Sequence, residues 1–311
     1  MTIEPETMTP AFEEETHDFD PTAPLTATGN LRRRHLVNRI AEGAATGAAV
    51  LAVAVLGIVV FSVLKRGAPA LSIDFLTKNP PLFGGPGGGI APAIVGTALL
   101  VLGATLMAMP LGILIALYMT EFASKRSANA IRLVLDLVNG LPSIVIGLFV
   151  FGLLVVGHHQ SGFAGSVALA VIMLPLIARG SQEVLLLVPQ SLREAADALG
   201  VSRFRAVIGV ILPSALGGIL TSTILAVARA AGETAPLIFA SSIPYGNGVS
   251  FDYFGHGLSN IPISIFQLSE QADPAGFERA WGAAFVLLSF ILIVSLAGRA
   301  SLARSRSKLT Q

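Results

Sequence analysis

Two charged residues, Arg229 and Glu233, interrupt a long apolar stretch of this sequence, from about residue 213 to residue 240. A charge at the centre of a membrane helix costs at least about 2.5 kcal/mol, so such residues normally face a bundle interior or a water-filled path. Spaced four apart, the two side chains are predicted to share one helix face. Either the pair neutralises itself and fixes the helix, or Arg229 offers its fork of donors to an anion. In the second case Glu233 accepts a hydrogen bond from a proton-bearing oxygen of that anion.

Three other charged residues lie in or near apolar stretches. Arg179 and Glu183 repeat the four-residue spacing close to one end of such a stretch. We expect them to be anchors whose charged heads reach the membrane interface. Asp136 lies in another apolar stretch, and its sequence context assigns it no role.

A polar segment, residues 189–212, carries a pattern suited to docking another protein. Ser191 and Glu194 have the spacing of a capping box, which predicts a helix over Leu192–Leu199. Gly200 can end that helix in the left-handed conformation. Small residues that permit close approach by a partner lie within it: Ala195, Ala196 and Ala198.

The residue types exclude several kinds of chemistry. The chain has no cysteine, so disulfides, thiolate catalysis and cysteine-type zinc sites are excluded. Its five histidines show no metal-ligand spacing. The glycine-rich run at residues 84–89 lacks the spacing of a phosphate-binding loop and is predicted to be a flexible connector. We therefore expect no metal, no cofactor, no catalytic residue and no nucleic-acid site.

Composition places the chain in a membrane. It is 53% hydrophobic and 13% charged, with a mean hydropathy of +0.74, whereas soluble domains carry about 25% charged residues. Apolar runs exceed the ~18 residues that indicate a membrane span. Residues 1–30 are acidic and rich in Pro and Thr, which predicts a disordered tail.

The remainder, residues 31–311, is predicted to be one all-α transmembrane domain with six spans. The expected spans are residues 40–64, 91–119, 131–156, 163–178, 213–240 and 279–297. A break is expected in the third span at Asn139-Gly140-Leu141-Pro142-Ser143, and a short helix at Ile263–Leu268 in the loop before the sixth.

The distribution of positive charge predicts the orientation. Segments on the side of the termini and of residues 189–212 hold fourteen Lys and Arg residues, and the opposite side holds four. Cytoplasmic loops carry the excess of these residues. Both termini and the polar segment are therefore expected in the cytoplasm.

The polar segment resembles the EAA loop of bacterial ABC importer permeases. That pattern is met by Glu194, Ala195, Ala196, Gly200, Val210, Leu212 and Pro213. The resemblance implies a type I ABC importer permease fold, in which this loop docks in a groove of the ATPase subunit and couples it to transport. The one departure is Val210, where Ile is usual.

A second resemblance concerns the apolar stretches. The run from Ala228 through Arg229, Gly232, Glu233 and Thr234 to Pro236 is similar to the fifth-helix signature of phosphate-specific importer permeases, in particular the PstA type. Asn139–Ser143 also resembles that family. The resemblance, which covers about residues 34–304, implies a substrate path lined by Arg229, Glu233, Thr234, Asn139 and Ser143.

The resemblance implies the assembly as well. A PstC-type permease subunit, a pair of PstB-type ATPases and a PstS-type phosphate-binding protein are the expected partners, in the bacterial cytoplasmic membrane and its lipid. ATP hydrolysis is expected in the ATPase, not in this chain. The alternative is a permease for another oxyanion, such as sulfate or molybdate. An intramembrane protease would need catalytic pairs that the spans lack, and a proton-coupled carrier would leave the EAA-like segment unexplained.

Overall fold

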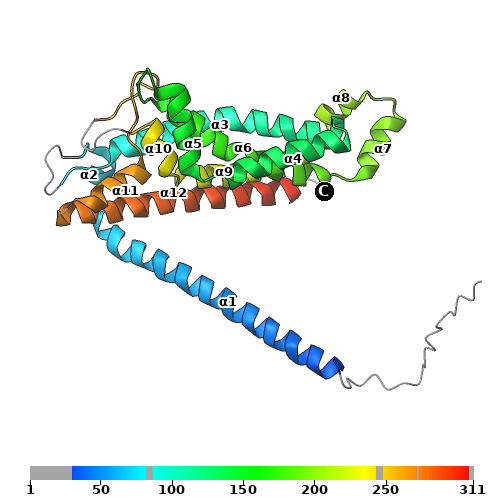
Figure 1. Ribbon diagram of the computed structural model, residues 1–311, viewed down its shortest axis with the longest axis horizontal. Coiled ribbons are helices and arrows are strands. Elements are labelled where there is room, and N and C mark those ends of the chain that lie inside the picture. The colour runs from blue at the N-terminus through cyan, green and yellow to red at the C-terminus, as the bar shows by residue number, and fades with distance from the viewer. Residues whose placement is uncertain (1–29, 82–86, 243–247, 272, 308–311) are drawn as a thin grey trace, which may run out of the picture. The chain divides into compact units, whose positions relative to one another are not determined.

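The computed structural model describes the backbone of residues 30–81, 87–242, 248–271 and 273–307, and side chains from 31 to 298 within these ranges. Every regular element in this described part is helical (Figure 1). The α-helices are α1 (Asn30–Gly67), α2 (Ile73–Thr77), α3 (Ala91–Leu117), α4 (Lys125–Gly140), α5 (Ser143–Val150), α6 (Gly162–Leu186), α7 (Gln190–Ala198), α8 (Arg203–Ala206), α9 (Leu212–Ala231), α10 (Ala235–Ala240), α11 (Ile261–Glu270) and α12 (Pro274–Ser307). The predicted disordered tail lies outside the described residues, apart from Asn30.

The chain divides into two compact units at residue 58, so α1 contributes to both. The described part of the first unit is the helical stretch 30–58. The second unit is a helical bundle in which α3 packs along α6, α6 along α9, and α12 against α9 and α11. In Figure 1, α7 and α8 lie at one end of this bundle, and α2 and α11 lie at the other.

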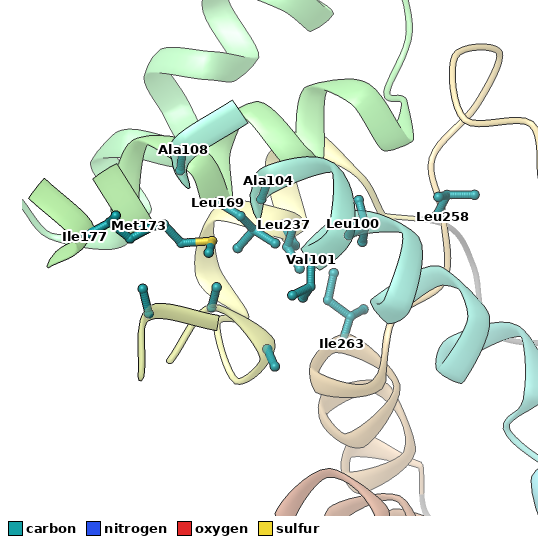
Figure 2. Close-up of a cluster of buried hydrophobic side chains, with 13 residues drawn as sticks. Leu100, Val101, Ala104, Ala108, Leu169, Met173, Ile177, Leu237, Leu258 and Ile263 are labelled. Carbon is teal, nitrogen blue, oxygen red and sulfur yellow. The ribbon is translucent and has the colours of Figure 1, made fainter. Parts of the chain in front are cut away.

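The main core of the bundle forms where α3 and α6 face each other. Leu100 and Ala104 of α3 and Leu169 and Met173 of α6 are fully buried there. Figure 2 shows these side chains pointing toward one another, with Leu237 of α10 beside them. Alanine on one helix opposite larger residues on the other lets the two backbones approach closely.

Five described helical stretches are long and apolar enough to cross a membrane, and a bent pair, α4 with α5 and the π turn after it, makes a sixth. The pair bends by 97°. The break lies within the predicted residues, because Pro142 disfavours helical geometry at Leu141, which is extended at φ −70° and ψ 137°.

Several predicted spans differ in extent from the helices observed. The first and last helices, α1 and α12, extend past the expected spans 40–64 and 279–297 at both ends. The fourth apolar helix, α6, continues to Leu186, eight residues past the expected end at residue 178. Polar residues such as Arg179 do not end a helix when the bundle offers them a partner. The fifth stretch is not continuous: α9 ends at Ala231, and α10 begins at Ala235. Pro236 lacks the N–H that would bond the carbonyl of residue 232, so a continuous helix is disfavoured there.

The short helix expected near residues 263–268 is present as α11. Asn260 caps it, accepting a hydrogen bond on its side-chain oxygen from the Ile263 amide at 3.0 Å. The loop before it inserts Tyr253 between α3 and α6. A Cβ on Gly103 would lie 2.2 Å from the Tyr253 hydroxyl, so this glycine makes room for the ring. Burial raises the pKa of Tyr253 above its ordinary value, and the hydrogen bond to Ser166 opposes this shift.

Candidate functional site

The first candidate site is the polar segment at the end of the bundle. Its helix, α7, begins two residues earlier than predicted, and Pro189 occupies the cap position with φ −55°. The prediction that Ser191 caps the helix was wrong, because Ser191 lies inside the first turn and no side chain caps that end. A proline already holds the backbone angle that a helix start needs.

The prediction for the other end of α7 is confirmed. Gly200 has φ +68°, the left-handed conformation. Its amide donates to the Asp197 carbonyl at 3.0 Å, and the Val201 amide donates to the Ala196 carbonyl at 3.1 Å. Together these two bonds form a Schellman motif, which satisfies carbonyls at the helix end and fixes the direction of the following chain.

The pattern residues of α7 divide between two faces. Glu194 and Ala195 are exposed, whereas Ala196 is buried. Two large apolar side chains that flank α7, Leu187 and Leu199, are exposed, whereas the exposed Phe204 and Ile208 lie in a stretch long and apolar enough to cross the membrane. Exposed apolar side chains beside a polar rim are typical of a protein-binding surface.

The end of the segment joins α7 and α8 to the bundle. Residues Val207–Ile211 form a π-helix that closes with the Leu212 amide bonded to the Val207 carbonyl. Pro213 stands in the first turn of α9, where a missing N–H costs little. Leu212 packs against a buried cluster formed by the ends of α3, α6 and α9, so the predicted segment ends where the bundle core begins.

Sequence reasoning missed one member of this site, Glu121. Its carboxylate is 4% exposed and accepts a hydrogen bond from Arg193 of α7 at 2.8 Å. Glu121 lies in the π turn Tyr118–Phe122 that ends α3. An acidic residue directly after an apolar run was the only signal in the sequence, and nothing there indicated its partner 72 residues away.

A pocket of about 520 Å³ lies between α7 and the bundle and is polar in character. Its lining includes Glu121, Arg193, Asp197 and Arg203. The guanidinium of Arg203 also lies over an aromatic ring, at 5.7 Å from the centroid of Phe122, which is within reach of a cation–π contact. Charged groups of both signs therefore surround the inner face of α7.

The second candidate site is the break between α9 and α10. Arg229 lies in the last turn of α9, but Glu233 lies past the helix end, so the two do not share a helix face as predicted. Their closest charged atoms, Arg229 Nε and Glu233 Oε1, are 3.7 Å apart. The Arg229 side chain is 55% exposed and that of Glu233 is 17% exposed. The guanidinium can thus reach an anion while it remains near the carboxylate.

The remaining predicted path residues lie at two helix breaks. Thr234 occupies the cap position of α10 without bonding through its side chain, and Asn139 and Ser143 flank the α4–α5 break. The segments after both breaks touch: a Cβ on Gly147 of α5 would lie 2.5 Å from Pro236 Cα of α10. The structure therefore brings the two broken segments together through their backbones.

Arg179 does not pair with Glu183 as a four-residue spacing suggests. It donates to Asp136 of α4, and Glu183 is exposed. The pair links α4 to α6 and supplies the role that the sequence did not assign to Asp136. Among the described residues, no group of three His, Cys, Asp or Glu side chains is arranged to hold a metal ion.

Comparisons with known proteins agree with this geometry. A family model described as "Binding-protein-dependent transport system inner membrane component" matches residues 108–307. The chain is 36% identical over 250 residues to the phosphate transport system permease protein PstA of Yersinia pestis, covering 80% of this chain and 84% of the relative. It is 38% identical over 246 residues to PstA of Pasteurella multocida, covering 78% of this chain and 85% of the relative.

Solved structures show a similar fold at lower identity. A chain from a bacterial alginate ABC transporter matches with a TM-score of 0.59 at 15% identity, covering 86% of this chain and 94% of its own. A chain from the inward-facing MetNI methionine ABC transporter matches with a TM-score of 0.54 at 19% identity, covering 70% and 94%. The fold is therefore that of ABC importer permeases.

Proposed function

The chain belongs to the family of binding-protein-dependent transport system inner membrane components and, within it, to the PstA permeases of phosphate transport systems, and we propose that it lines the path of inorganic phosphate through the membrane. It acts as one permease subunit of an ATP-driven importer. A PstC-type subunit completes the path, a PstB-type pair hydrolyses ATP, and a PstS-type protein delivers phosphate. The similarity to PstA proteins over most of the chain favours phosphate over sulfate or molybdate.

The observation that carries this proposal is α7 at the end of the bundle. Its cap at Gly200 is fixed by two backbone bonds, and Glu194 and Ala195 face outward beside exposed leucines. A short rigid helix with a small-residue face and an apolar surround suits a groove in another protein. We assign this surface to the ATPase subunit, which agrees with the predicted cytoplasmic location of α7 and both termini.

The break between α9 and α10 supplies the proposed anion contact. Arg229 is more than half exposed in the isolated chain, although it belongs to a membrane-spanning helix. A guanidinium in that position presents several donors to phosphate oxygens. Glu233, held nearby at 3.7 Å, can accept a hydrogen bond from the protonated oxygen of hydrogen phosphate, an oxygen that sulfate lacks at neutral pH. Phosphate transport therefore requires the placement of both charges.

A charge swap tests this assignment. Reconstituted with its partner subunits, the Arg229→Glu/Glu233→Arg variant keeps the net charge but moves the guanidinium four residues along the chain, from the last turn of α9 to a position past the helix end. We expect the swap and both single changes, Arg229→Glu and Glu233→Arg, to lose uptake of radiolabelled phosphate, while the swapped protein still assembles with its partners. Arg126→Gln, an exposed arginine outside the site, serves as the control.

Near-normal phosphate uptake by the swapped variant would show that the pair is only structural. Competition distinguishes the substrate: excess unlabelled phosphate should abolish uptake by the unmodified complex, whereas excess sulfate or molybdate should leave it unchanged. Strong inhibition by either of these anions would favour the other oxyanion instead.

A further inference from the structure

Arg193 contacts three acceptors at the ends of two different helices of the bundle. Its Nη2 donates to Glu121 Oε1 at 2.8 Å and to the Leu185 carbonyl at 3.1 Å, and its Nη1 donates to the Val188 carbonyl at 2.8 Å. Leu185 belongs to the last turn of α6, and Val188 follows its end. One side chain of α7 is therefore bonded to the ends of both α3 and α6.

The backbone of α3 changes its winding where it meets this side chain. Residues Tyr118–Phe122 form a π-helix directly after α3, and Glu121 is its buried acidic residue. A π turn shifts the residues that follow it around the helix axis, and such turns are frequent at functional sites. Here the carboxylate lies on the side that faces α7 rather than on the surface.

The ends of the helices are also joined by apolar packing. A buried cluster beside the ion pair contains Leu117 of α3, Leu185 of α6, Val207 and Ile211 of the π-helix before α9, and Ile219 of α9. These helix ends form one packed block. The ion pair with Glu121 fastens α7 to the end of α3, and the hydrogen bonds from Arg193 to the Leu185 and Val188 carbonyls fasten it to the end of α6. These two helices are in turn packed along each other.

Stability alone gives little reason for a charged pair at this place. Replacing a buried ion pair by well-packed apolar residues is often neutral or stabilising, whereas removing one partner leaves an uncompensated charge. What the guanidinium adds is geometry, because its planar fork directs bonds to several acceptors at once. Apolar side chains would fill the same space but would let α7 slide against α3 and α6.

We propose that Arg193 and Glu121 form a clamp that makes α7 move as one rigid body with the ends of α3 and α6, so that displacement of α7 by the ATPase reaches the membrane helices directly. Arg193 and Glu121 are positioning residues here and need not touch the transported anion. The inference rests on the proposed function in one respect, the identification of α7 as the helix that the ATPase moves.

A double-variant cycle separates the clamp from a merely structural pair. In the reconstituted complex, Arg193→Gln and Glu121→Gln are compared alone and together, with Arg126→Gln as a control for the loss of a cytoplasmic-end charge. Each single change leaves a charge without its partner and should reduce assembly. The double change leaves no such charge, so assembly should recover.

The deciding quantity is then the coupling ratio, which is the number of phosphate ions imported per ATP hydrolysed. We expect the assembled double variant to import about tenfold less phosphate per ATP hydrolysed than the unmodified complex, a loss typical of coupling between sites. Recovery of the ratio together with assembly would overturn the clamp. The Arg126→Gln complex should keep the unmodified ratio.

A measurement of the distance between α7 and α3 tests the clamp independently of which anion is transported. The chain has no cysteine, so spin labels can be attached at Ala198→Cys on α7 and Leu114→Cys in the last turn of α3, both exposed positions. In the otherwise unmodified complex we expect one narrow distance distribution that is the same without nucleotide and with trapped ATP. In the double variant the distribution should broaden and differ between the two states.

An unchanged narrow distribution in the double variant would overturn the clamp, and so would a shift between nucleotide states in the otherwise unmodified complex. Failure of the unmodified complex to import phosphate would instead refute the proposed function. In that case the distance distributions still decide whether α7 is clamped to α3.

Discussion

Gly200 gives the sharpest test of the docking helix, because its substitution changes backbone conformation and nothing else. The residue has φ +68°, and a Cβ built on it meets no atom within 4 Å. Gly200→Ala therefore adds no clash, but holding an L-residue in the left-handed region costs about 1–2 kcal/mol. The two bonds that close the end of α7, from the Gly200 and Val201 amides, exist only in that conformation.

This cost sets the size of the expected effect. A penalty of one to two kcal/mol changes an equilibrium by a factor of about 5–30. If α7 must be capped to dock, Gly200→Ala should weaken binding of the ATPase subunit to the permease by about this factor, measured by titration in lipid nanodiscs. Gly200→Asn should lose less, because asparagine tolerates the left-handed region. Gly200→Val should lose more and abolish phosphate uptake, while the protein still reaches the membrane.

A second glycine provides a matched control. Gly157 has φ +82°, and a Cβ there also meets no atom within 4 Å, but it lies in the turn that precedes α6, away from α7. Gly157→Ala carries the same backbone penalty and should leave ATPase affinity unchanged. Equal losses for the two alanine variants, or normal affinity for Gly200→Val, would refute the link between the cap and docking.

Three further predictions concern packing, orientation and pH. Gly147→Ala should lower the free energy of unfolding by about 1–3 kcal/mol, because its Cβ would overlap the α10 backbone. Gly152 has open space around it, so Gly152→Ala should leave the free energy of unfolding unchanged. Thermal unfolding of the purified chain compares the two variants. In intact cells, Ser202→Cys should resist a membrane-impermeant thiol reagent and Ser269→Cys should react with it, and the opposite pattern would reverse the orientation. Burial raises the pKa of Tyr253, so its neutral form stabilises the fold below about pH 10, the ordinary pKa of tyrosine. The unfolding temperature of the unmodified protein should therefore fall as the pH rises beyond about 10. In the Tyr253→Phe variant, which has no hydroxyl to ionise, it should fall less.

The elements that the sequence predicted well are those set by local chemistry. Long apolar runs predicted the membrane helices, and the proline in Asn139–Ser143 predicted the break between α4 and α5. Gly200 predicted the left-handed end of α7 because glycine adopts this conformation at little cost. Each of these predictions depends on residues within one or two turns of one another.

Other expectations failed where a local pattern had two solutions. Ser191 and Glu194 fit a capping box, but the helix begins two positions earlier, at Gln190, with Pro189 in the cap position. Arg229 and Glu233 fit one helix face, but the backbone breaks between them at Gly232. A four-residue spacing is informative only while the helix continues, and the pattern itself does not say that it does.

The sequence by itself determined that this chain is an all-helical membrane protein, and its motifs indicated the importer family and the docking segment. Only the tertiary structure decided which charges meet: Arg179 with Asp136, and Arg193 with Glu121. The partners are 43 and 72 residues apart, and their contact depends on how α4, α6 and α7 pack and on one π turn after α3. No periodicity records such a packing, because the energy of an ion pair depends on distance in space and not on separation along the chain.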